Sequence, residues 1–280
     1  MVLTRVPVGL HTGGTYQEAQ MDLSIFSLSG KVAVVTGAGR GIGRGIALGF
    51  ADVGANVVLA ARTASDIEAV AAEVRDKGGR ALAVPADARN PEQVAALVDR
   101  AVGEFGGIDV LVNNAGGSFG APFLDLSHNA WDSVIRENLD SVFLCTRAVV
   151  DRMIERGGGS IINVASLAGQ VPYPNWSHYG AAKAAVLNLT QTLAVELGPH
   201  NIRVNAILPA YVETEFLRQR HEEDPAMRQR RLDMLPIGRF GTPEDAAAVA
   251  VFLASDASRF VTGAQILLSG GLTYLTAELR

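Results

Sequence analysis

The chain contains 280 residues, of which 48% are hydrophobic and 19% charged, so it can bury a large core and is not expected to be disordered. Its net charge of −5, without any Lys/Arg run, excludes a nucleic-acid-binding surface, and no apolar run reaches the ~18 residues of a membrane span. The single cysteine, Cys145, excludes an intrachain disulfide and a cysteine-cluster metal site, and its scarcity fits a reducing, cytoplasmic compartment. The histidines show no metal-ligand spacing.

Residues 1–26 show no clear periodicity, carry one basic residue, Arg5, and lack the apolar core of a secretory signal. We therefore expect a loose N-terminal extension, followed by one domain over residues 27–280. Met21 opens a segment that leads directly into the first apolar run, which suggests that residues 1–20 are dispensable or precede the true start.

From Lys31 onward, short apolar runs alternate with longer helical patterns. The runs are rich in Val, Ile and Leu without polar alternation, which is typical of a parallel sheet covered on both faces. The predicted strands are Val32–Thr36, Asn56–Ala61, Ala81–Pro85, Ile108–Asn113, Ser160–Ala165, Arg203–Leu208 and Gln265–Ser269. The predicted helices are Ile42–Val53, Asp66–Lys77, Glu92–Glu104, Asn129–Arg156, His178–Leu197 and Pro243–Ala254. This order predicts an α/β fold with a seven-stranded, doubly wound parallel sheet and right-handed crossovers.

Three predicted helices begin with residues that are typical of helix caps. Ser65-x-x-Glu68 has the spacing of a capping box, while Asn90 and Thr242 each precede a proline.

Residues 213–239 form the one long stretch predicted to be irregular. We expect this stretch to be a substrate lid at the carboxyl ends of the strands.

A glycine-rich turn follows the first strand, with Gly37, Gly41 and Gly43 in the spacing G-x-x-x-G-x-G. Between a strand and a helix, such glycines let a diphosphate approach the backbone N–H groups at the helix N-terminus. A turn kept only for packing is the alternative. No Gly-Lys-Ser/Thr follows, so the pattern is not that of a P-loop.

The end of the second strand bears on the choice of cofactor. It ends in Arg62, without the acidic residue that bonds the ribose of NAD. The guanidinium groups of Arg62 and Arg40 favour binding of the 2′-phosphate of NADPH, although NAD(H) is still possible. The alternative is that both arginines are solvated surface residues. Asp87 is a candidate for the adenine amine or an ordinary turn residue. Asn114 either contributes to the cofactor site or satisfies its own turn.

Four polar residues form the candidate catalytic set. Tyr179 and Lys183 are four residues apart in a helix, so the ammonium is expected to lower the pKa of the phenol. This pair alone is a weak signal. Ser166 follows an apolar strand at the ligand-binding edge, where its hydroxyl can bond a carbonyl oxygen. Asn138 lies on an apolar helix face, where it either bends the helix or holds a water molecule.

Together these motifs resemble the short-chain dehydrogenase/reductase family over about residues 28–272. The resemblance implies a single Rossmann-type domain that interconverts a ketone and a secondary alcohol by hydride transfer. It implies that Tyr179 is the general acid or base, that Lys183 supports it and bonds the nicotinamide ribose, and that Ser166 polarises the carbonyl. It further implies a proton-relay water on Asn138 and cofactor contacts from Ile42, Pro209, Val212 and Thr214, and the family is commonly tetrameric.

Two departures from the family pattern and the residues near the site bear on specificity. Ala210 stands where the family usually has glycine, and Ser269 where many members have aspartate. The candidate pocket lining is Gly117, Phe119, Ala168, Val171, Tyr173, Trp176 and residues 216–234. It suggests a fairly apolar small-molecule substrate, such as a 3-oxoacyl thioester or a ketosteroid. A redox sensor that only binds NADPH and a silent subunit of a hetero-oligomer remain the alternatives.

Overall fold

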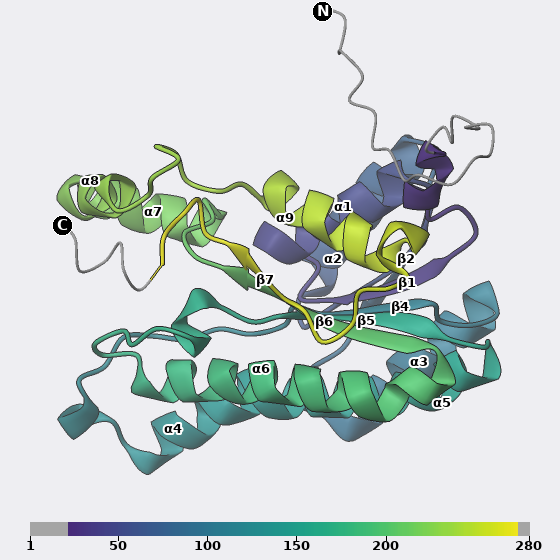
Figure 1. Ribbon diagram of the computed structural model, residues 1–280, viewed down its shortest axis with the longest axis horizontal. Coiled ribbons are helices and arrows are strands. Elements are labelled where there is room, and N and C mark those ends of the chain that lie inside the picture. Colours follow the sequence, from purple (N-terminus) through teal and green to yellow (C-terminus); the bar gives the residue numbers. More distant parts are fainter. Residues whose placement is uncertain (1–21, 274–280) are drawn as a thin grey trace, which may run out of the picture.

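The computed structural model describes residues 22–273, and its centre is one seven-stranded sheet (Figure 1). The strand order is β3-β2-β1-β4-β5-β6-β7, and every neighbouring pair is parallel. The strands are β1 (Val32–Thr36), β2 (Asn56–Ala61), β3 (Arg80–Pro85), β4 (Val110–Asn113), β5 (Gly159–Val164), β6 (Ile202–Pro209) and β7 (Gln265–Leu268). The predicted doubly wound α/β fold is confirmed, and each strand lies within two residues of its predicted bounds.

Helices cover both faces of the sheet, in two layers that Figure 1 shows above and below it. One layer consists of α1 (Gly41–Asp52), α2 (Ala64–Asp76) and α9 (Pro243–Ala254). The other contains α3 (Pro91–Phe105), α4 (His128–Ile135), α5 (Ser141–Glu155) and α6 (Ser177–Leu197). Strand β1 is buried along its whole length: Ala33 and Val35 join one core cluster, and Val32 and Val34 join the other. Burial on both faces explains why the strand sequences show no polar alternation.

Two of the three predicted capping signals are confirmed. The side chain of Asn90 accepts a hydrogen bond from Gln93 N at the start of α3, and Thr242 forms a reciprocal capping box with Asp245 at the start of α9. The box predicted at Ser65 is wrong. Helix α2 begins at Ala64, so Ser65 lies inside its first turn, where its hydroxyl cannot act as the cap.

The helix predicted over residues 129–156 is interrupted. Helices α4 and α5 are separated by a π-helical turn, Arg136–Asp140, that contains Asn138. The side chain of Asn138 donates to Val134 O at 3.0 Å and to Gly117 O at 2.7 Å. It thereby ties the widened turn to the loop after β4, a local feature that apolar periodicity does not reveal.

The segment predicted to be irregular between residues 213 and 239 contains two short helices, α7 (Glu215–Glu223) and α8 (Pro225–Asp233). Thr214 caps α7 by accepting from Leu217 N, and Asp224 caps α8 by accepting from Met227 N. Both helices are strongly polar and largely exposed, so they lack the apolar stripe by which a helix is normally predicted.

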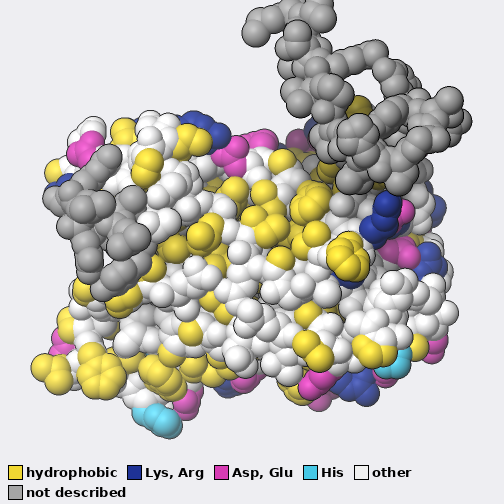
Figure 2. Space-filling view, in the orientation of Figure 1, with side chains coloured by type: hydrophobic (Ala, Val, Ile, Leu, Met, Phe, Trp, Pro, Cys, Tyr) yellow, Lys and Arg dark blue, Asp and Glu magenta, His cyan; other side chains and the backbone are white. Residues whose placement is uncertain are grey.

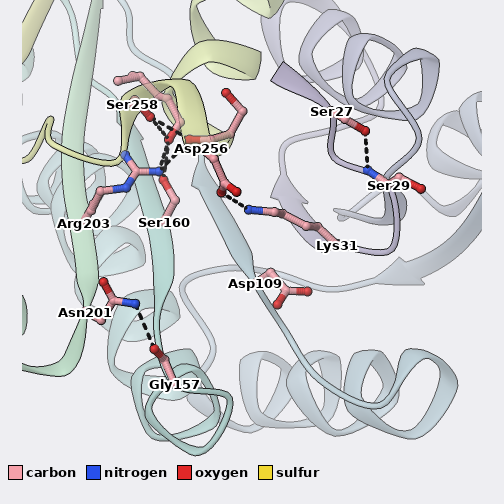
Figure 3. A network of polar contacts seen from close by, with 12 residues as sticks. Ser27, Ser29, Lys31, Asp109, Gly157, Ser160, Asn201, Arg203, Asp256 and Ser258 are labelled. Carbon is pink, nitrogen blue, oxygen red and sulfur yellow. Dashed lines mark hydrogen bonds and ion pairs between the residues drawn. The ribbon is translucent and has the colours of Figure 1, made fainter. Parts of the chain in front are cut away.

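A polar network closes the amino-terminal ends of the strands (Figure 3). Arg203, at the start of β6, donates to the carbonyl oxygens of Leu253 at 2.7 Å and of Val261 and Ser255 at 3.3 Å each. The hydroxyls of Ser160 and Ser258 also donate to Leu253 O. This network anchors the chain after α9 to the sheet, at the edge opposite the carboxyl ends.

Residues 22–26 of the predicted loose extension begin the described chain, and Leu23–Phe26 forms a 3₁₀ turn capped by Asp22. The expectations for residues 1–21 lie outside the described residues. No helix within residues 22–273 is long and apolar enough to cross a membrane.

Candidate active site

A cavity of about 570 Å³ opens at the carboxyl ends of the strands. Its lining comes from the loops after β1, β2, β3, β4, β5 and β6 and from α7 and α8. Of the residues predicted for catalysis or cofactor contact, those that line it are Gly37, Arg40, Ile42, Arg62, Asp87, Asn114, Asn138, Ser166, Tyr179, Lys183, Pro209, Val212 and Thr214. Residues far apart in the sequence therefore meet at the sheet edge where doubly wound proteins bind ligands.

The glycine turn after β1 is locked against the end of β4. A Cβ at position 43 would lie 2.3 Å from both Gly37 O and Asn114 Nδ2, so only glycine fits there. Asn114 Nδ2 donates to Thr36 O at 3.0 Å and to Gly37 O at 3.1 Å, so its side chain hydrogen-bonds two carbonyl groups of the turn. Gly41 has φ +56° and lies under the methyl group of Thr214. The turn thus presents bare backbone to the cavity, as an approaching diphosphate requires.

Arginine and acid face each other at the end of β2. Arg62 Nη2 lies 3.5 Å from Glu137 Oε1, an acid that precedes Asn138 and also lines the cavity. The Arg62 side chain is 59% exposed, so this ion pair is weak. Arg40 occupies the position before α1 without a side-chain cap bond. Both arginines line the cavity, and Arg62 has a carboxylate partner that was not predicted from the sequence.

The carboxylate of Asp87 is engaged by its own loop. Arg89 binds it through Nε at 2.9 Å and Nη2 at 2.6 Å. The side-chain hydrogen bond from Arg89 lowers the pKa of Asp87 to about 2, against the opposing effect of burial. Asp87 still lines the cavity, but its oxygens are already bonded within the turn.

Ser166 and Tyr179 meet at the end of β5. The Ser166 hydroxyl forms a hydrogen bond to the Tyr179 side chain and accepts from Ala168 N at 3.1 Å. Burial raises the pKa of Tyr179, and the bond from Ser166 only partly opposes this. The pKa is thus shifted upward, opposite to the lowering expected from Lys183, because burial of the phenol has the largest effect.

Lys183 lies one helical turn beyond Tyr179 and is almost fully buried. Its Nζ donates to Val164 O at 2.9 Å and lies 5.6 Å from the centre of the Tyr179 ring. Burial lowers the pKa of Lys183 to about 8, whereas the nearby Glu137 carboxylate raises it. The side chain is thus a buried cation with one hydrogen-bond partner among the described residues.

Asn138 binds the loop after β4 from both of its amide atoms. Besides donating to Gly117 O, it accepts from Gly117 N at 3.3 Å. A Cβ at position 116 would lie 2.7 Å from Asn138 Oδ1 and 3.6 Å from Lys183 Nζ, so both residues flank Gly116. These bonds support the helix-bend alternative for Asn138.

The loop after β6 tolerates the alanine that departs from the family pattern. Ala210 has no positive φ, lines the cavity and donates its N–H to Leu268 O at 3.0 Å. Ser269 lies nearly buried beyond β7, and its carbonyl accepts from Leu272 N. Val212 and Thr214, which follow Ala210 in this loop, both line the cavity.

Part of the predicted pocket lining reaches the cavity. Gly117, Ala168, Tyr173 and Trp176 line it, and from the predicted stretch 216–234 so do Phe216, Leu217, Arg220 and Arg231. Phe119 instead stacks on His178, and Val171 packs into the hydrophobic cluster around Leu235. Glu137 and Arg89 also line the cavity, although neither was predicted from the sequence. Within residues 22–273, no group of three potential ligands is arranged to hold a metal ion.

Comparison with known proteins decides the family. The family model described as enoyl-(acyl carrier protein) reductase matches residues 37–273. The chain is 42% identical to 2-dehydro-3-deoxy-D-gluconate 5-dehydrogenase of Escherichia coli K12, over 90% of this chain and 98% of that protein. It is 40% identical to the 3-oxoacyl-[acyl-carrier-protein] reductase FabG of Thermotoga maritima, over 88% and 98%. The chain belongs to the short-chain dehydrogenase/reductase family.

A solved structure of this family extends the comparison to the fold. A 7α-hydroxysteroid dehydrogenase complexed with NADH and 7-oxo glycochenodeoxycholic acid is 36% identical, with a TM-score of 0.87 over 91% of this chain and 98% of that chain. The protein is thus an oxidoreductase of the short-chain family, which acts on CH–OH and C=O groups. The substrates of these relatives differ widely, from an acyl carrier protein thioester to a sugar acid and a steroid acid.

Proposed function

We propose that the protein interconverts a ketone and a secondary alcohol with NAD(P)(H), with NADPH preferred. The observation that carries this proposal is the convergence of Ser166, Tyr179 and Lys183 beside the glycine turn in one cavity. A protein that only senses NADPH has no need of a buried proton donor hydrogen-bonded to a serine. When bound, the nicotinamide supplies the hydride that adds to the carbonyl carbon.

The proposed roles follow from the protonation states and bonds of these side chains. Tyr179 donates its proton to the carbonyl oxygen in reduction and accepts it back in oxidation. Its raised pKa keeps the phenol protonated at neutral pH, which is the form that reduction requires. Ser166 donates to the same oxygen. The N–H groups of Lys183 that do not bind Val164 O are assigned to the ribose hydroxyls. Asn138 Nδ2 is already bonded to Gly117 O and Val134 O, so the relay water is assigned to the remaining acceptor site of Asn138 Oδ1.

The preference for NADPH rests on charge at the end of β2. Arg62 and Arg40 line the cavity, and no acid takes the place of Arg62 at the end of that strand. A guanidinium can bind the 2′-phosphate of NADPH with two parallel hydrogen bonds, which NADH cannot receive. The fit is supported by the bare glycine turn next to these two residues, where a diphosphate is proposed to bind.

We also propose a homotetramer, because the sheet ends in an exposed edge. Leu267 of β7 is 43% exposed and Val195 of α6 is 78% exposed. Figure 2 shows hydrophobic side chains across the middle of this face, with most charged side chains near its margins. An apolar edge strand with no partner is a site for pairing between copies of a chain.

The test of the proposed function is oxidation of NADPH and NADH in the presence of ketones, followed by the absorbance of the reduced nicotinamide. The panel contains a 3-oxoacyl thioester, a ketosteroid, a quinone and an oxo sugar acid. We expect turnover with NADPH at a lower KM than with NADH. Tyr179→Phe is expected to lower kcat by about 10²–10⁴-fold, because it removes the proton donor.

The same variant separates the alternatives. Tyr179→Phe must retain NADPH binding and thermal stability, so that lost turnover reports chemistry rather than misfolding. Tight NADPH binding without turnover of any carbonyl in the wild-type protein would instead favour a sensor or a silent subunit. Equal KM values for NADPH and NADH would contradict only the cofactor preference.

A further inference from the structure

The charged side chains in the cavity fall into two groups. At the cofactor end, the arginines face acids: Arg62 lies against Glu137, and Arg89 is bound to Asp87. At the lid end, which α7 and α8 line, Arg220 and Arg231 form no salt bridge with an acid of residues 22–273. The lid end is therefore a positively charged region of the same cavity that Tyr179 lines.

We propose that the lid end of the cavity binds a carboxylate group of the substrate, so that the protein acts on an oxo acid and its hydroxy acid. This inference rests on the proposed function and names its substrate class. The carbonyl would lie at Ser166 and Tyr179, and the carboxylate at Arg231 and Arg220. A purely apolar ketone, as suggested by the sequence, would leave the half-buried guanidinium group of Arg231 without an anionic partner.

Arg231 is held in place before any ligand binds. Its guanidinium stacks over the Tyr211 ring, 5.1 Å from the ring centre, and its Nη1 lies 3.3 Å from Nε2 of the buried His221. His221 in turn stacks on Phe240, with ring centres 4.8 Å apart. An arginine fixed in this way loses little conformational freedom when it binds a planar carboxylate through two hydrogen bonds.

Two tyrosines, Tyr173 and Tyr211, line the cavity beside Arg231. Tyr173 lines the cavity and hydrogen-bonds to Tyr211. Burial raises the pKa of Tyr173, whereas the charge of Arg231 opposes this, so the guanidinium and this phenol share one environment. Trp176, which also lines the cavity, lies edge-on against Tyr179 with ring centres 5.7 Å apart. The cationic wall therefore adjoins the proposed proton donor through one aromatic contact.

Acids near the lid are occupied elsewhere. Arg220 and Arg231 also line a hollow next to the cavity, together with Glu223 and Asp224. Asp224 caps α8 through Met227 N at 2.8 Å and lies 3.7 Å from Arg230, while Glu223 accepts from Gln219 at 3.3 Å. Within residues 22–273, no carboxylate oxygen lies within 4.0 Å of Arg220 or Arg231 in a salt bridge. Their charges are available to a ligand.

Two sources of such a substrate fit the cavity. One is a polyhydroxy oxo acid, whose hydroxyls would meet Tyr173 and Tyr211. The other is a steroid oxo acid, whose rings would lie on Trp176, Phe216 and Leu217. Both share the carboxylate that the arginines require, so the experiment uses one substrate pair from each source.

Each pair differs only at the carboxylate. The first is 5-oxogluconate and the ketose of the same skeleton with the carboxyl group reduced. The second is a 7-oxo steroid acid and its methyl ester. With NADPH saturating, we expect kcat/KM for the acid of one pair to exceed that of its uncharged partner by about 10–100-fold, the range for a charge-assisted bond. Which acid is preferred identifies the source.

The variants test whether the arginines carry this preference. Arg231→Gln is expected to remove most of the preference by raising KM for the acid, with less than about threefold change for the uncharged partner. Arg220→Gln should act in the same direction but less strongly, because Arg220 is more exposed. Arg218→Gln, on the same helix but outside the cavity, is the matched control and should leave the preference intact.

Three outcomes would overturn the carboxylate site alone. Equal kcat/KM for acid and uncharged partner in the wild-type protein would remove it and leave the oxidoreductase function intact. The same holds if Arg231→Gln slows both members of a pair equally, or if a 3-oxoacyl thioester outperforms both acids. Absence of turnover with every carbonyl would overturn the proposed function and the carboxylate site together.

Discussion

Two cations lie at opposite edges of the sheet, and both donate to backbone carbonyl groups. Arg203, at the amino ends of the strands, donates to three carbonyl oxygens in a network with the neighbouring serines (Figure 3). Lys183, at the carboxyl ends, donates to Val164 O alone. Burial lowers the pKa of both side chains. The two cations therefore differ in how many hydrogen bonds their N–H groups donate.

This difference separates structure from function. A buried cation whose donors are bonded rigidifies the chain, whereas one that keeps free donors costs stability and remains able to bind a ligand. On this basis, removing Arg203 should weaken the fold without altering catalysis. Removing Lys183 should abolish catalysis without weakening the fold. The predictions below test this opposition.

The largest effect is expected from Lys183→Met. The variant loses the donors proposed for the cofactor ribose and the relay, so kcat/KM should fall by about 100-fold or more. It also removes a buried charge with a single partner, so the free energy of unfolding at pH 7 should rise by about 1–2 kcal/mol. Steady-state kinetics and urea unfolding without cofactor measure the two effects. A stability loss that parallels the activity loss would contradict the comparison.

The stability difference between the wild-type protein and Lys183→Met should also change with pH in a defined direction. Because burial lowers the pKa of Lys183 to about 8, the folded protein releases a proton that the unfolded chain keeps up to its ordinary pKa near ~10.4. The stability of the wild-type protein should therefore rise relative to Lys183→Met as the pH increases above 8. Between pH 8 and pH 9.5 the relative gain is at most about 2 kcal/mol. Parallel profiles for the two proteins would show that Lys183 is not the titrating group.

Arg203→Met should show the opposite pattern, with a somewhat smaller effect. Each carbonyl that Arg203 binds keeps another donor: Ser160 at Leu253 O, Asn205 at Val261 O and Ser258 at Ser255 O. The expected loss in the free energy of unfolding is therefore about 1–3 kcal/mol, and not the full cost of three unpaired groups. Thermal and urea unfolding measure the loss, while KM and kcat should stay within about twofold. A selective fall in kcat would couple the two edges of the sheet.

The strands and most helices follow from the sequence because burial on both faces leaves a long-range apolar pattern. All seven strands were predicted for this reason. The π turn at Asn138 and the helices α7 and α8 were not, because each depends on side-chain bonds rather than periodicity. A polar helix held by its N-cap residue and a few contacts shows no apolar stripe, and its caps resemble ordinary loop residues.

The candidate site shows the same limit. Residues at strand ends, such as Ser166 and Arg62, are brought to the cavity by the sheet topology and can be predicted from it. Arg231 belongs to the stretch 216–234 that was predicted to line the pocket, but its position over the Tyr211 ring depends on helix α8, which was not predicted. Glu137 was hidden by its position in a helix, where an acid is usually solvated. Contacts made by helices and loops, whose relative positions are not fixed by strand pairing, therefore could not be predicted from the sequence.

The smallest predicted effect concerns Glu137 at the cofactor end. Glu137→Gln removes the carboxylate 3.5 Å from Arg62, which is expected to free the guanidinium for a 2′-phosphate. Because Arg62 is largely exposed, the pair is worth at most about 1 kcal/mol, so KM for NADPH should fall by about two- to fivefold. KM for NADH should not fall. Kinetics with both cofactors measure the change in their ratio.

A double-variant cycle decides whether this effect passes through Arg62. Arg62→Gln should raise KM for NADPH, and adding Glu137→Gln to it should bring no further gain, since the competing ion pair is already absent. Glu137 also raises the pKa of Lys183, so Glu137→Gln should shift the Lys183 titration to lower pH even when Arg62 is missing. A KM effect that depends on Arg62, together with a pH shift that does not, would show that one carboxylate acts separately on cofactor choice and on the buried lysine. If the KM effect persisted without Arg62, Glu137 would act on the cofactor directly, and the charge at the end of β2 would no longer explain the preference for NADPH.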